Sequence, residues 1–346
     1  MQICINYNSR LKNKTVKKSS LHSLINETWY SKNTLSQLLI PLSLIYCGIV
    51  AIRKTLYSLK ILKSTKISVP VIIVGNITAG GTGKTPLVIW LVKYLKENGF
   101  NPGVISRGYK GKAKSWPQQV RPDSDPVIVG DEAILISRQA GCPMAVGPDR
   151  VSTAEALLKY YNCDIIISDD GLQHYALQRT IEVVVIDGVR RFGNGKCIPA
   201  GPLRESTSRL EKADFLVTNG IAAPGEFAMR YSGKTVKNLT NKNELTLSDF
   251  KGNTVHAVSA IGNTQRFYDY LRSQGLKVIE HSFPDHYMYN AADLSFDDDL
   301  AVIMTEKDAV KCQRYNFENS WYLPIKVEMK KDFGLRLLNK LGDKDG

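Results

Sequence analysis

Apolar and polar positions follow a helical rhythm in the first part of the chain. Between residues 34 and 62, apolar residues recur at steps of three and four positions, which predicts one apolar face on a long helix. Pro41 and Gly48 lie within this stretch and should bend or weaken the helix. The preceding residues 1–27 are polar, basic and without period, so we expect them to be a disordered extension.

From residue 69 the rhythm changes to short apolar runs that alternate with helical stretches. Apolar runs of about five residues are typical of parallel strands covered on both faces, and their alternation with helices predicts a doubly wound α/β sheet. The expected strands are 71–75, 102–106, 144–146, 164–168, 183–187 and 215–219, and the expected helices are 84–98, 130–140 and 152–161. After a loose stretch around 222–250, strands at 255–260, 278–280 and 301–305 and a helix at 264–273 predict a smaller C-terminal α/β lobe.

Positive charge is concentrated at the start of the chain. The net charge is +13, and residues 1–66 hold eleven Lys and Arg residues against a single acid, Glu27. No charge lies between Leu35 and Ile52, and basic residues follow at once. This pattern is typical of a helix that lies in a membrane interface and is attracted to anionic headgroups. A core helix is the alternative, and the pattern leaves open whether the segment spans the membrane or lies on it.

Other compositional features exclude several classes of protein. The cysteines form no Cys-x-x-Cys pair and have no zinc-like spacing with histidine, so we expect core thiols in a reducing compartment. The first thirty residues lack the apolar run and cleavage site of a signal peptide. No nucleic-acid recognition motif is found, so a basic tail that binds nucleic acid is not expected.

The strongest chemical signal is the segment Gly75-Asn-Ile-Thr-Ala-Gly-Gly-Thr-Gly-Lys-Thr85, which joins a buried strand to a helix. Glycines in such a turn let backbone N–H groups form one phosphate-binding nest, to which the helix N-terminus adds its positive dipole end. Lys84 can reach the β- and γ-phosphates, and the Thr85 hydroxyl can ligate Mg²⁺. One departure is Thr78, which stands where this P-loop motif usually has glycine. The residues expected to bind the nucleotide are Thr78, Ala79, Gly80, Gly81, Thr82, Gly83, Lys84 and Thr85.

A second signal is an apolar strand that ends in Asp169 and Asp170. P-loop enzymes use an acid at the end of a strand to hold Mg²⁺. Side chains of consecutive residues point in different directions, so one carboxylate can serve the metal and the other a water or a neighbouring amide. With the P-loop upstream, these two residues predict a magnesium site.

Two further segments allow two interpretations each. Asp131 and Glu132 follow Gly130 at an expected helix start, where acids can simply complement the helix dipole or can supply a general base for an acceptor hydroxyl. His286 follows Asp285 in a proline-containing loop, which can be a polar surface turn or part of a site.

Several basic residues lie in loops beside glycine or proline. Arg107, Arg150 and Arg204 suit an anionic ligand at the carboxyl edge of a sheet, because the guanidinium fork matches phosphate. A surface salt bridge explains each of them equally well, and the same holds for Lys307 in Thr305-Glu-Lys-Asp308. A guanine-reading Asn-Lys-x-Asp motif is absent, and Ala79 occupies the position where DNA-partition ATPases carry a second lysine.

Taken together, seven segments resemble the tetraacyldisaccharide 4'-kinases, the kinases of lipid A biosynthesis in Gram-negative bacteria. In chain order they are Gly75–Pro86, Ser106-Arg-Gly-Tyr109, Gly130-Asp-Glu132, Asp169-Asp-Gly-Leu-Gln-His174, Gly201-Pro-Leu-Arg-Glu205, Phe283-Pro-Asp-His286 and Met304-Thr-Glu-Lys-Asp308. The resemblance covers about residues 28–345. Tyr287 stands where the family often has a second histidine, so a role for that second ring is in doubt here.

The resemblance implies transfer of the ATP γ-phosphate to the 4'-hydroxyl of tetraacyldisaccharide 1-phosphate, with Mg²⁺, to give lipid IVA. It implies a peripheral site or a single N-terminal anchor at the cytoplasmic face of the inner membrane, and we expect a monomer. By motif, Asp131 is implied as catalytic base with His286 as its partner, and Lys84 acts on the phosphates. Thr85, Glu132, Asp169 and Asp170 are implied to arrange the metal. The residues implied to lie near the phosphates or the disaccharide are Arg107, Arg150, Gln173, His174, Arg204 and Glu205.

The expected organisation therefore has four segments. They are a basic extension at 1–27, a membrane-associating helical segment at 28–66, a P-loop kinase core at 67–224 and a smaller C-terminal α/β lobe at 225–346. Two other functions stay open on the residues alone. One is a membrane-bound ATPase that acts as a switch or assembly factor, and the other is a kinase with a soluble acceptor.

Overall fold

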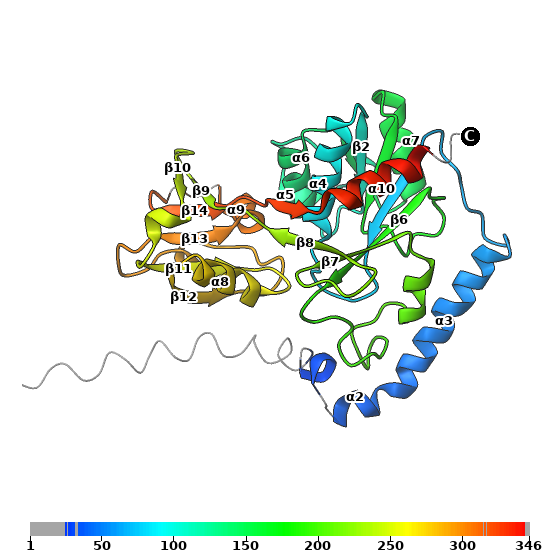
Figure 1. Cartoon of the computed structure of the whole chain (residues 1–346), viewed down its shortest axis with the longest axis horizontal. Helices are drawn as coiled ribbons and strands as arrows, with labels where there is room; N and C mark the ends of the chain where they lie inside the picture. Colours follow the sequence, from blue (N-terminus) through cyan, green and yellow to red (C-terminus); the bar gives the residue numbers. More distant parts are fainter. Residues whose placement is uncertain (1–24, 26, 32–33, 314, 316, 343–346) are drawn as a thin grey trace, which may run out of the picture. The chain divides into compact units, whose positions relative to one another are not determined.

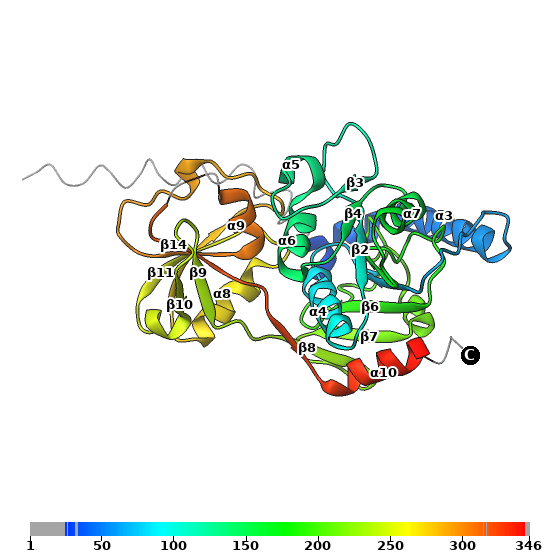
Figure 2. The same cartoon turned by 90° about the horizontal axis from the view of Figure 1, so that it is seen from above.

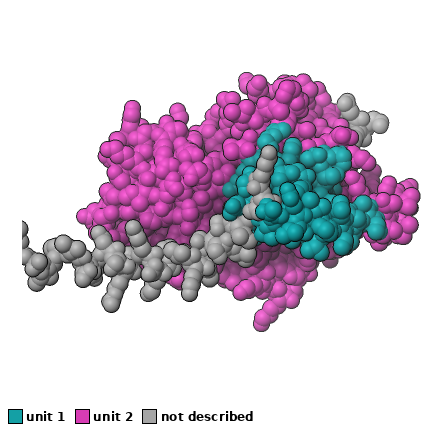
Figure 3. Space-filling view, turned by 90° about the horizontal axis from the view of Figure 1, so that it is seen from below, with its two compact units in different colours: residues 1–53, 77–79, 190–209 teal, residues 54–76, 80–189, 210–346 magenta. Residues whose placement is uncertain are grey.

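The computed structural model describes residues 25, 27–31, 34–313, 315 and 317–342 (Figure 1). The extension expected at residues 1–27 therefore lies almost entirely outside the described residues. The chain divides into two compact units, coloured separately in Figure 3. Unit 1 joins residues 1–53, 77–79 and 190–209, and unit 2 contains the remainder.

Unit 2 is built around a nine-stranded, mostly parallel sheet. Its order is β15-β8-β7-β6-β1-β5-β2-β4-β3, and only the edge strands β3 and β15 pair antiparallel. The strands are β1 (Val71–Gly75), β2 (Pro102–Ser106), β3 (Gln118–Gln119), β4 (Met144–Val146), β5 (Ile165–Asp169), β6 (Ile181–Asp187), β7 (Phe215–Asn219), β8 (Phe227–Tyr231) and β15 (Val327–Met329). Because its central strands are covered on both faces, they are buried along their length, which confirms the doubly wound α/β prediction.

The order of the strands decides which helices cover which face of this sheet. The connections from β1 to β2 and from β2 to β4 move toward one edge, whereas the connection from β4 to β5 returns. Since such crossovers are right-handed, α4 (Lys84–Glu97) and α6 (Asp131–Ala140) lie on one face and α7 (Arg150–Tyr160) on the other. A short helix, α5 (Pro126–Val129), precedes α6, and α10 (Lys331–Gly342) packs Phe333 against Trp90 of α4.

A second sheet of six strands lies between β8 and β15 in the sequence (Figure 2). Its order is β10-β9-β14-β13-β11-β12, with α8 (Thr264–Ser273) packed on Val255 and Ala257, and α9 (Glu306–Cys312) in a separate cluster with Val258. The strands are β9 (Thr235–Asn238), β10 (Glu244–Thr246), β11 (Thr254–Ser259), β12 (Lys277–Ser282), β13 (Val302–Thr305) and β14 (Ser320–Leu323). The chain thus enters the second sheet after β8 and returns to the first sheet at β15.

Unit 1 is organised around two helices, α2 (Thr34–Leu38) and α3 (Ile40–Ser58, which continues past the unit boundary at Arg53). The break at Leu39 places Pro41 in the first turn of α3. Backbone N–H groups in a first turn have no partner within the helix, so a proline there costs no helical hydrogen bond. Ser36 donates to the carbonyl of Ala200 at 2.8 Å, and Ser43 donates to that of Cys197 at 2.8 Å. The helices are therefore attached to segment 190–209 through their serines.

The apolar side chains of α3 are exposed instead of buried. Leu42, Leu44, Ile45, Ile49 and Ile52 are each more than half exposed. By length and composition α3 could cross a membrane, with a mean hydropathy of 1.3 over its best window and 6% of that window buried. The alternative of an ordinary core helix requires buried apolar side chains, and α3 does not have them.

Candidate functional site

The P-loop joins the end of β1 to the start of α4, as the sequence predicts. Gly83 is the residue before the helix, and its φ of 101° lies in the left-handed region. A Cβ at this position would meet Nδ2 of Asn219 at 2.4 Å, and that same amide donates to the carbonyl of Thr82 at 3.1 Å. Asn219 at the end of β7 therefore holds the last turn of the loop and requires glycine there.

Lys84 is held at the base of this loop. Its ammonium group donates to Oδ1 of Asn76 at 3.1 Å and lies 3.3 Å from a carboxylate oxygen of Asp170. Asn76 directly follows β1 and is fully buried. The ammonium group of Lys84 therefore lies at the carboxyl ends of β1 and β5, close to the segment that contains Asp169 and Asp170.

Asp169 ends β5, and Asp170 follows it in a left-handed conformation with φ of 50°. Asp169 is buried, and its Oδ1 has no hydrogen-bond partner among the described residues. Burial raises the pKa of Asp169 above its ordinary value, and repulsion from Glu132 adds to this shift. A buried carboxylate oxygen with this environment fits a cation ligand, so the residues present fit Mg²⁺.

The structure brings together Asp131 and His286, which are 155 positions apart in the sequence. Asp131 is the first residue of α6, and both of its carboxylate oxygens lie 3.0 Å from Nδ1 of His286. Both side chains are nearly buried, with 8% and 10% exposed, and the ring of Tyr109 lies 5.2 Å from that of His286. The surface-turn interpretation of His286 is therefore wrong, because its ring is enclosed and paired.

The electrostatics of this pair keep Asp131 ionised. Burial alone would raise the pKa of Asp131, but the hydrogen bond from His286 and the attraction of Lys307 outweigh burial and hold the pKa well below its ordinary value. Lys307 lies on α9, and its Nζ is 2.9 Å from Oε1 of Glu132 and 3.1 Å from Oδ1 of Asp285. Three carboxylates, one imidazole and one lysine therefore form one cluster.

Three of the predicted substrate residues support the ends of the strands. Arg150 is buried and donates to the carbonyl of Gly147 at 2.7 Å and, more weakly, to that of Asp169 at 3.4 Å. Burial lowers its pKa to about 10. His174 lies 3.3 Å from the backbone N–H of Arg150 through Nε2, and Gln173 donates to the carbonyl of Asn76 at 3.1 Å.

The remaining predicted substrate residues lie elsewhere in the fold. Arg107 is exposed in the loop after β2. Arg204 belongs to unit 1, where its backbone N–H donates to Ile77 at 2.7 Å and its carbonyl accepts from Tyr46 at 3.0 Å. Glu205, also in unit 1, is buried and lies 3.6 Å from Nε of Arg209.

The two ends of the P-loop belong to different units. Thr78 and Ala79 belong to unit 1, where Thr78 bridges to Leu203 and the N–H of Ala79 donates to Pro202 at 2.7 Å. The residues from Gly80 to Thr85, which are also expected to bind the nucleotide, belong to unit 2.

Sequence reasoning missed the supporting residues of the site. Asn76 directly follows the buried strand β1, and Asn219 is the last residue of the buried strand β7. A polar residue at the end of an apolar run is the signal that could have identified both. Lys307 is noted in the sequence, but nothing there distinguishes it from a surface lysine, because its partners lie on distant segments.

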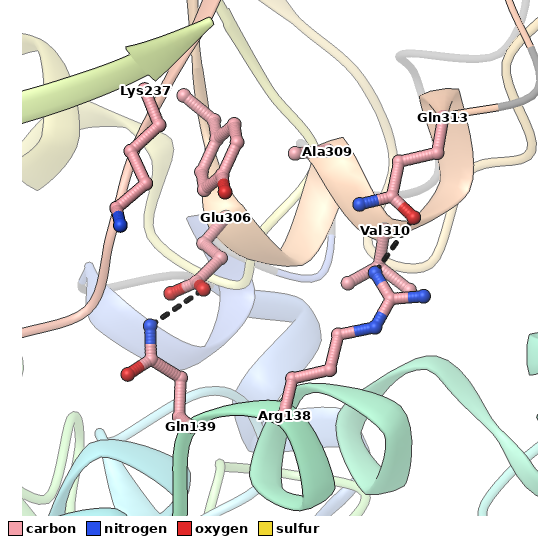
Figure 4. A pocket seen from close by; sticks show the side chains of 8 residues that line it. Arg138, Gln139, Lys237, Glu306, Ala309, Val310 and Gln313 are labelled. Carbon is pink, nitrogen blue, oxygen red and sulfur yellow. Dashed lines mark hydrogen bonds between the residues drawn. The ribbon is translucent and has the colours of Figure 1, made fainter. Parts of the chain in front are cut away.

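A separate cavity of about 260 Å³ lies between α6 and α9 (Figure 4). Arg138 and Gln139 reach it from α6, Glu306 reaches it from α9, and Gln313 reaches it from the position after that helix. Lys237 and Tyr322 complete its polar wall. Gln139 donates to Glu306 at 2.6 Å and Arg138 to Gln313 at 2.7 Å. These contacts join α6 to α9 at the end of α6 opposite Asp131.

Comparisons with known proteins identify the family of this chain. The family model of tetraacyldisaccharide-1-P 4'-kinase matches residues 35–342. A tetraacyldisaccharide 4'-kinase of Nitrosococcus oceani is 49% identical over 93% of this chain and 96% of its own length, and one of Hahella chejuensis is 46% identical over 92% and 96%. A crystal structure of LpxK from Aquifex aeolicus in complex with ATP has a TM-score of 0.75 at 30% identity, and the match covers 89% of this chain and 99% of that one. With a P-loop, an acid pair at the end of β5 and a buried Asp131–His286 pair in place, this chain belongs to the tetraacyldisaccharide 4'-kinase family.

Proposed function

We propose that Asp131, held by His286, is the general base of the phosphoryl transfer that this kinase family carries out. The reaction moves the γ-phosphate of ATP to the 4'-hydroxyl of tetraacyldisaccharide 1-phosphate and gives lipid IVA in lipid A biosynthesis. The observation that carries the proposal is the buried contact at 3.0 Å between Asp131 and His286. A carboxylate buried next to a phosphate site and oriented by an imidazole is suited to receive the proton of an attacking alcohol.

The low pKa of Asp131 is consistent with this role. A carboxylate with a lowered pKa is a weak base, so it cannot remove a hydroxyl proton early in the reaction. Phosphoryl transfer passes through a loose transition state, in which the attacking oxygen becomes acidic only as its bond to phosphorus forms. Asp131 would therefore orient the hydroxyl first and take its proton late.

The loop at residues 78–85 would bind the phosphates of ATP. Backbone N–H groups of the glycine-rich turn and the N-terminus of α4 would face the phosphates, and Lys84 would neutralise their charge. Thr85, Glu132, Asp169 and Asp170 would hold Mg²⁺, which this family uses with ATP. When bound, the metal supplies positive charge to the phosphate oxygens.

The residues expected near the phosphates or the acceptor divide into those that would bind it directly and those that would support the backbone. Arg107 is exposed and free of the backbone bonds that occupy Arg150, so it would contact an anionic group of the lipid directly. Arg150, Gln173 and His174 would act by fixing the backbone at the ends of β1 and β5. Arg204 and Glu205 of unit 1 would bind the disaccharide 1-phosphate.

The exposed apolar face of α3 supports an anchor at the cytoplasmic face of the inner membrane. The acceptor carries acyl chains that stay in the bilayer, and an apolar helix followed by basic residues is suited to an anionic surface. We further propose that the enzyme acts as a monomer with a P-loop core and a smaller C-terminal α/β lobe.

An assay of labelled phosphate transfer tests the role of Asp131. With γ-labelled ATP, Mg²⁺ and tetraacyldisaccharide 1-phosphate in detergent micelles, the wild-type protein should form a bisphosphorylated lipid. Asp131→Ala should lower turnover by about 10²–10⁴-fold, because the general base is removed, while the affinity for ATP persists.

The matched control is Asp125→Ala. Asp125 also begins a helix, and its side chain accepts from the N–H of Val127 at 2.8 Å, but it is exposed and outside the cluster. This control should keep wild-type turnover. Equal turnover in the two variants would restrict Asp131 to helix capping. Release of free phosphate without labelled lipid would instead favour the ATPase alternative.

A further inference from the structure

Lys307 is a buried lysine whose ammonium group lies among the acidic side chains of the site. It lies in the first turn of α9, directly after β13, and the side chain of Thr305 caps this turn by accepting from the N–H of Asp308 at 3.2 Å. Its Nζ contacts Glu132 at 2.9 Å, Asp285 at 3.1 Å and Nε2 of His286 at 3.5 Å. One cation therefore reaches both segments that form the Asp131–His286 pair.

These contacts decide which nitrogen of His286 carries the proton. Nε2 lies 3.5 Å from the Lys307 ammonium, which has only donors, and 3.8 Å from Oδ2 of Asp285, so the nearer group favours a lone pair on Nε2. The neutral ring therefore has its proton on Nδ1, from which it donates to Asp131, and its lone pair on Nε2 faces Lys307.

The charges around the ring come from every element packed on it. Asp131 contacts the ring from α6, Lys307 from α9 and Asp285 from its own loop, and the ring of Tyr109 lies 5.2 Å away. The ammonium of Lys307 lies between two carboxylates, 2.9 Å from Glu132 and 3.1 Å from Asp285. Both contacts are charge-assisted hydrogen bonds, so the lysine joins α6 to the loop that carries His286.

We propose that Lys307 is a positioning residue for the phosphoryl transfer: it ties Glu132 on α6 to Asp285 beside His286 and fixes the ring as the Nδ1–H tautomer that orients Asp131. This inference rests on the proposed role of Asp131. Lys307 acts through His286 and Glu132, so its loss should slow the chemical step with little effect on nucleotide affinity.

A simpler role for Lys307 would be to hold α6 against α9. The chain offers a matched control for that role, because Gln139 of α6 also bonds to α9, through Glu306, the residue next to Lys307 (Figure 4). Gln139→Ala loosens the same pair of helices without touching the Asp131–His286 pair. A purely structural lysine predicts similar kinetics for both variants.

Kinetics of the full chain separate the two roles. Lys307→Met should lower kcat by about 10–100-fold, the size expected for a supporting residue, with KM for ATP and the dissociation constant of ATP changed by less than about threefold. Lys307→Arg should recover part of kcat, because a guanidinium can also bridge two carboxylates. Gln139→Ala should keep kcat within about twofold even if its melting temperature falls. A wild-type kcat in Lys307→Met, or an equal loss in Gln139→Ala, would overturn the proposal.

A second measurement reads the wild-type protein directly and uses a variant only to assign its signals. Nitrogen NMR of the histidine rings, with His286→Gln to assign the signal, should show His286 as the Nδ1–H tautomer. A proton on Nε2 of the neutral ring would contradict the assigned role of Lys307. The proposed function fails separately, if Asp131→Ala keeps turnover, whatever the tautomer of His286.

Discussion

Asp131 and Asp169 are two buried aspartates with opposite surroundings. Asp131 accepts from His286 and lies near Lys307, so its pKa falls. Asp169 has an oxygen without a protein partner and lies near Glu132, so its pKa rises. The protein itself stabilises the ionised form of Asp131, whereas a bound cation would be needed to stabilise the ionised form of Asp169. The difference matches the separate roles of base and metal ligand proposed for them.

The raised pKa of Asp169 predicts a pH-dependent effect on stability. At pH values between the ordinary pKa of 3.8 and the raised pKa, Asp169 binds its proton more tightly in the folded protein than in the unfolded chain. The free energy of unfolding therefore falls as the pH rises through this window. The variant Asp169→Asn has no ionisable group at this position, so it does not lose this stability as the pH rises. Without Mg²⁺, the variant should therefore melt at a higher temperature than the wild type at about pH 7.5, and the difference should shrink toward about pH 4. Asp131 has the opposite shift, but it is present in both proteins and cancels in the comparison.

Mg²⁺ provides the control for this prediction. If Asp169 is a metal ligand, Mg²⁺ with an ATP analogue should raise the melting temperature of the wild type more than that of Asp169→Asn. Melting curves measured by calorimetry at both pH values give the comparison. Identical melting temperatures at about pH 7.5 would show that Asp169 is not destabilised by its burial.

At the residue scale, local patterns found the reactive groups but not their partners. Lys84, Asp169 and Asp131 stand at strand or helix ends, where the neighbouring residues already indicate a site. The contact of Asp131 with His286 joins residues 155 positions apart, and family resemblance alone implied it. The contacts of Lys307 depend on how α9 packs against α6, which no local pattern of apolar residues encodes.

At the scale of elements, the P-loop contains two glycines with a left-handed backbone, Gly80 and Gly83, and only Gly83 is also closely packed. Gly83 has φ of 101°, and Asn219 leaves no space for a Cβ there. Gly81, two residues earlier, does not have a left-handed φ, and a Cβ on it would make only ordinary contacts, at 3.6 Å from Gly262. The packing of this loop therefore requires glycine at position 83 and tolerates a Cβ at position 81.

Gly83→Ala should destabilise the nucleotide-free protein more than Gly81→Ala. A residue other than glycine whose backbone is held in the left-handed region lowers the free energy of unfolding by about 1–3 kcal/mol. The close approach of Asn219 to the added Cβ lowers it further. Gly81→Ala should change the free energy of unfolding by less than about 1 kcal/mol. Denaturant unfolding without nucleotide measures both values, and equal losses would mean that the backbone of Gly83 is not under this constraint.

Most elements could be predicted because their apolar runs are long and fully buried. All six strands expected in the first sheet are present, with ends that differ by at most two residues. The elements that were missed have mixed polarity, since β8 (Phe227–Tyr231) and β14 (Ser320–Leu323) combine aromatic with polar residues near the sheet edges. The return of β15 to the first sheet could not be predicted, because strand pairing across about a hundred residues leaves no local signal.

At the scale of the whole molecule, α3 reverses the usual distribution of side chains. Its Ser43 donates to the carbonyl of Cys197, while its leucines and isoleucines are exposed. A surface helix normally buries its apolar side, so this arrangement leaves a continuous apolar face for another medium. With basic residues concentrated in the first 66 positions, an anionic bilayer is the medium that both features suit.

Replacing apolar side chains of α3 should therefore weaken membrane binding without affecting the P-loop. Ile45, Ile49 and Ile52 are each about 60% exposed, so their replacement by serine removes no core packing. Full burial of one isoleucine contributes about 1.5–3 kcal/mol, so partial insertion of three should change partitioning onto anionic vesicles by at least about tenfold. Turnover on lipid in vesicles should fall in parallel, while the affinity for ATP stays at the wild-type value.

Ile221→Ser is the control, because Ile221 is 85% exposed but lies in unit 2, far from α3 in the sequence. Cosedimentation with anionic vesicles measures binding, and neutral vesicles separate the apolar contribution from the electrostatic one. If the triple variant binds and turns over lipid as the wild type does, α3 is not the membrane contact. Another part of the protein would then have to bring the enzyme to its acylated acceptor.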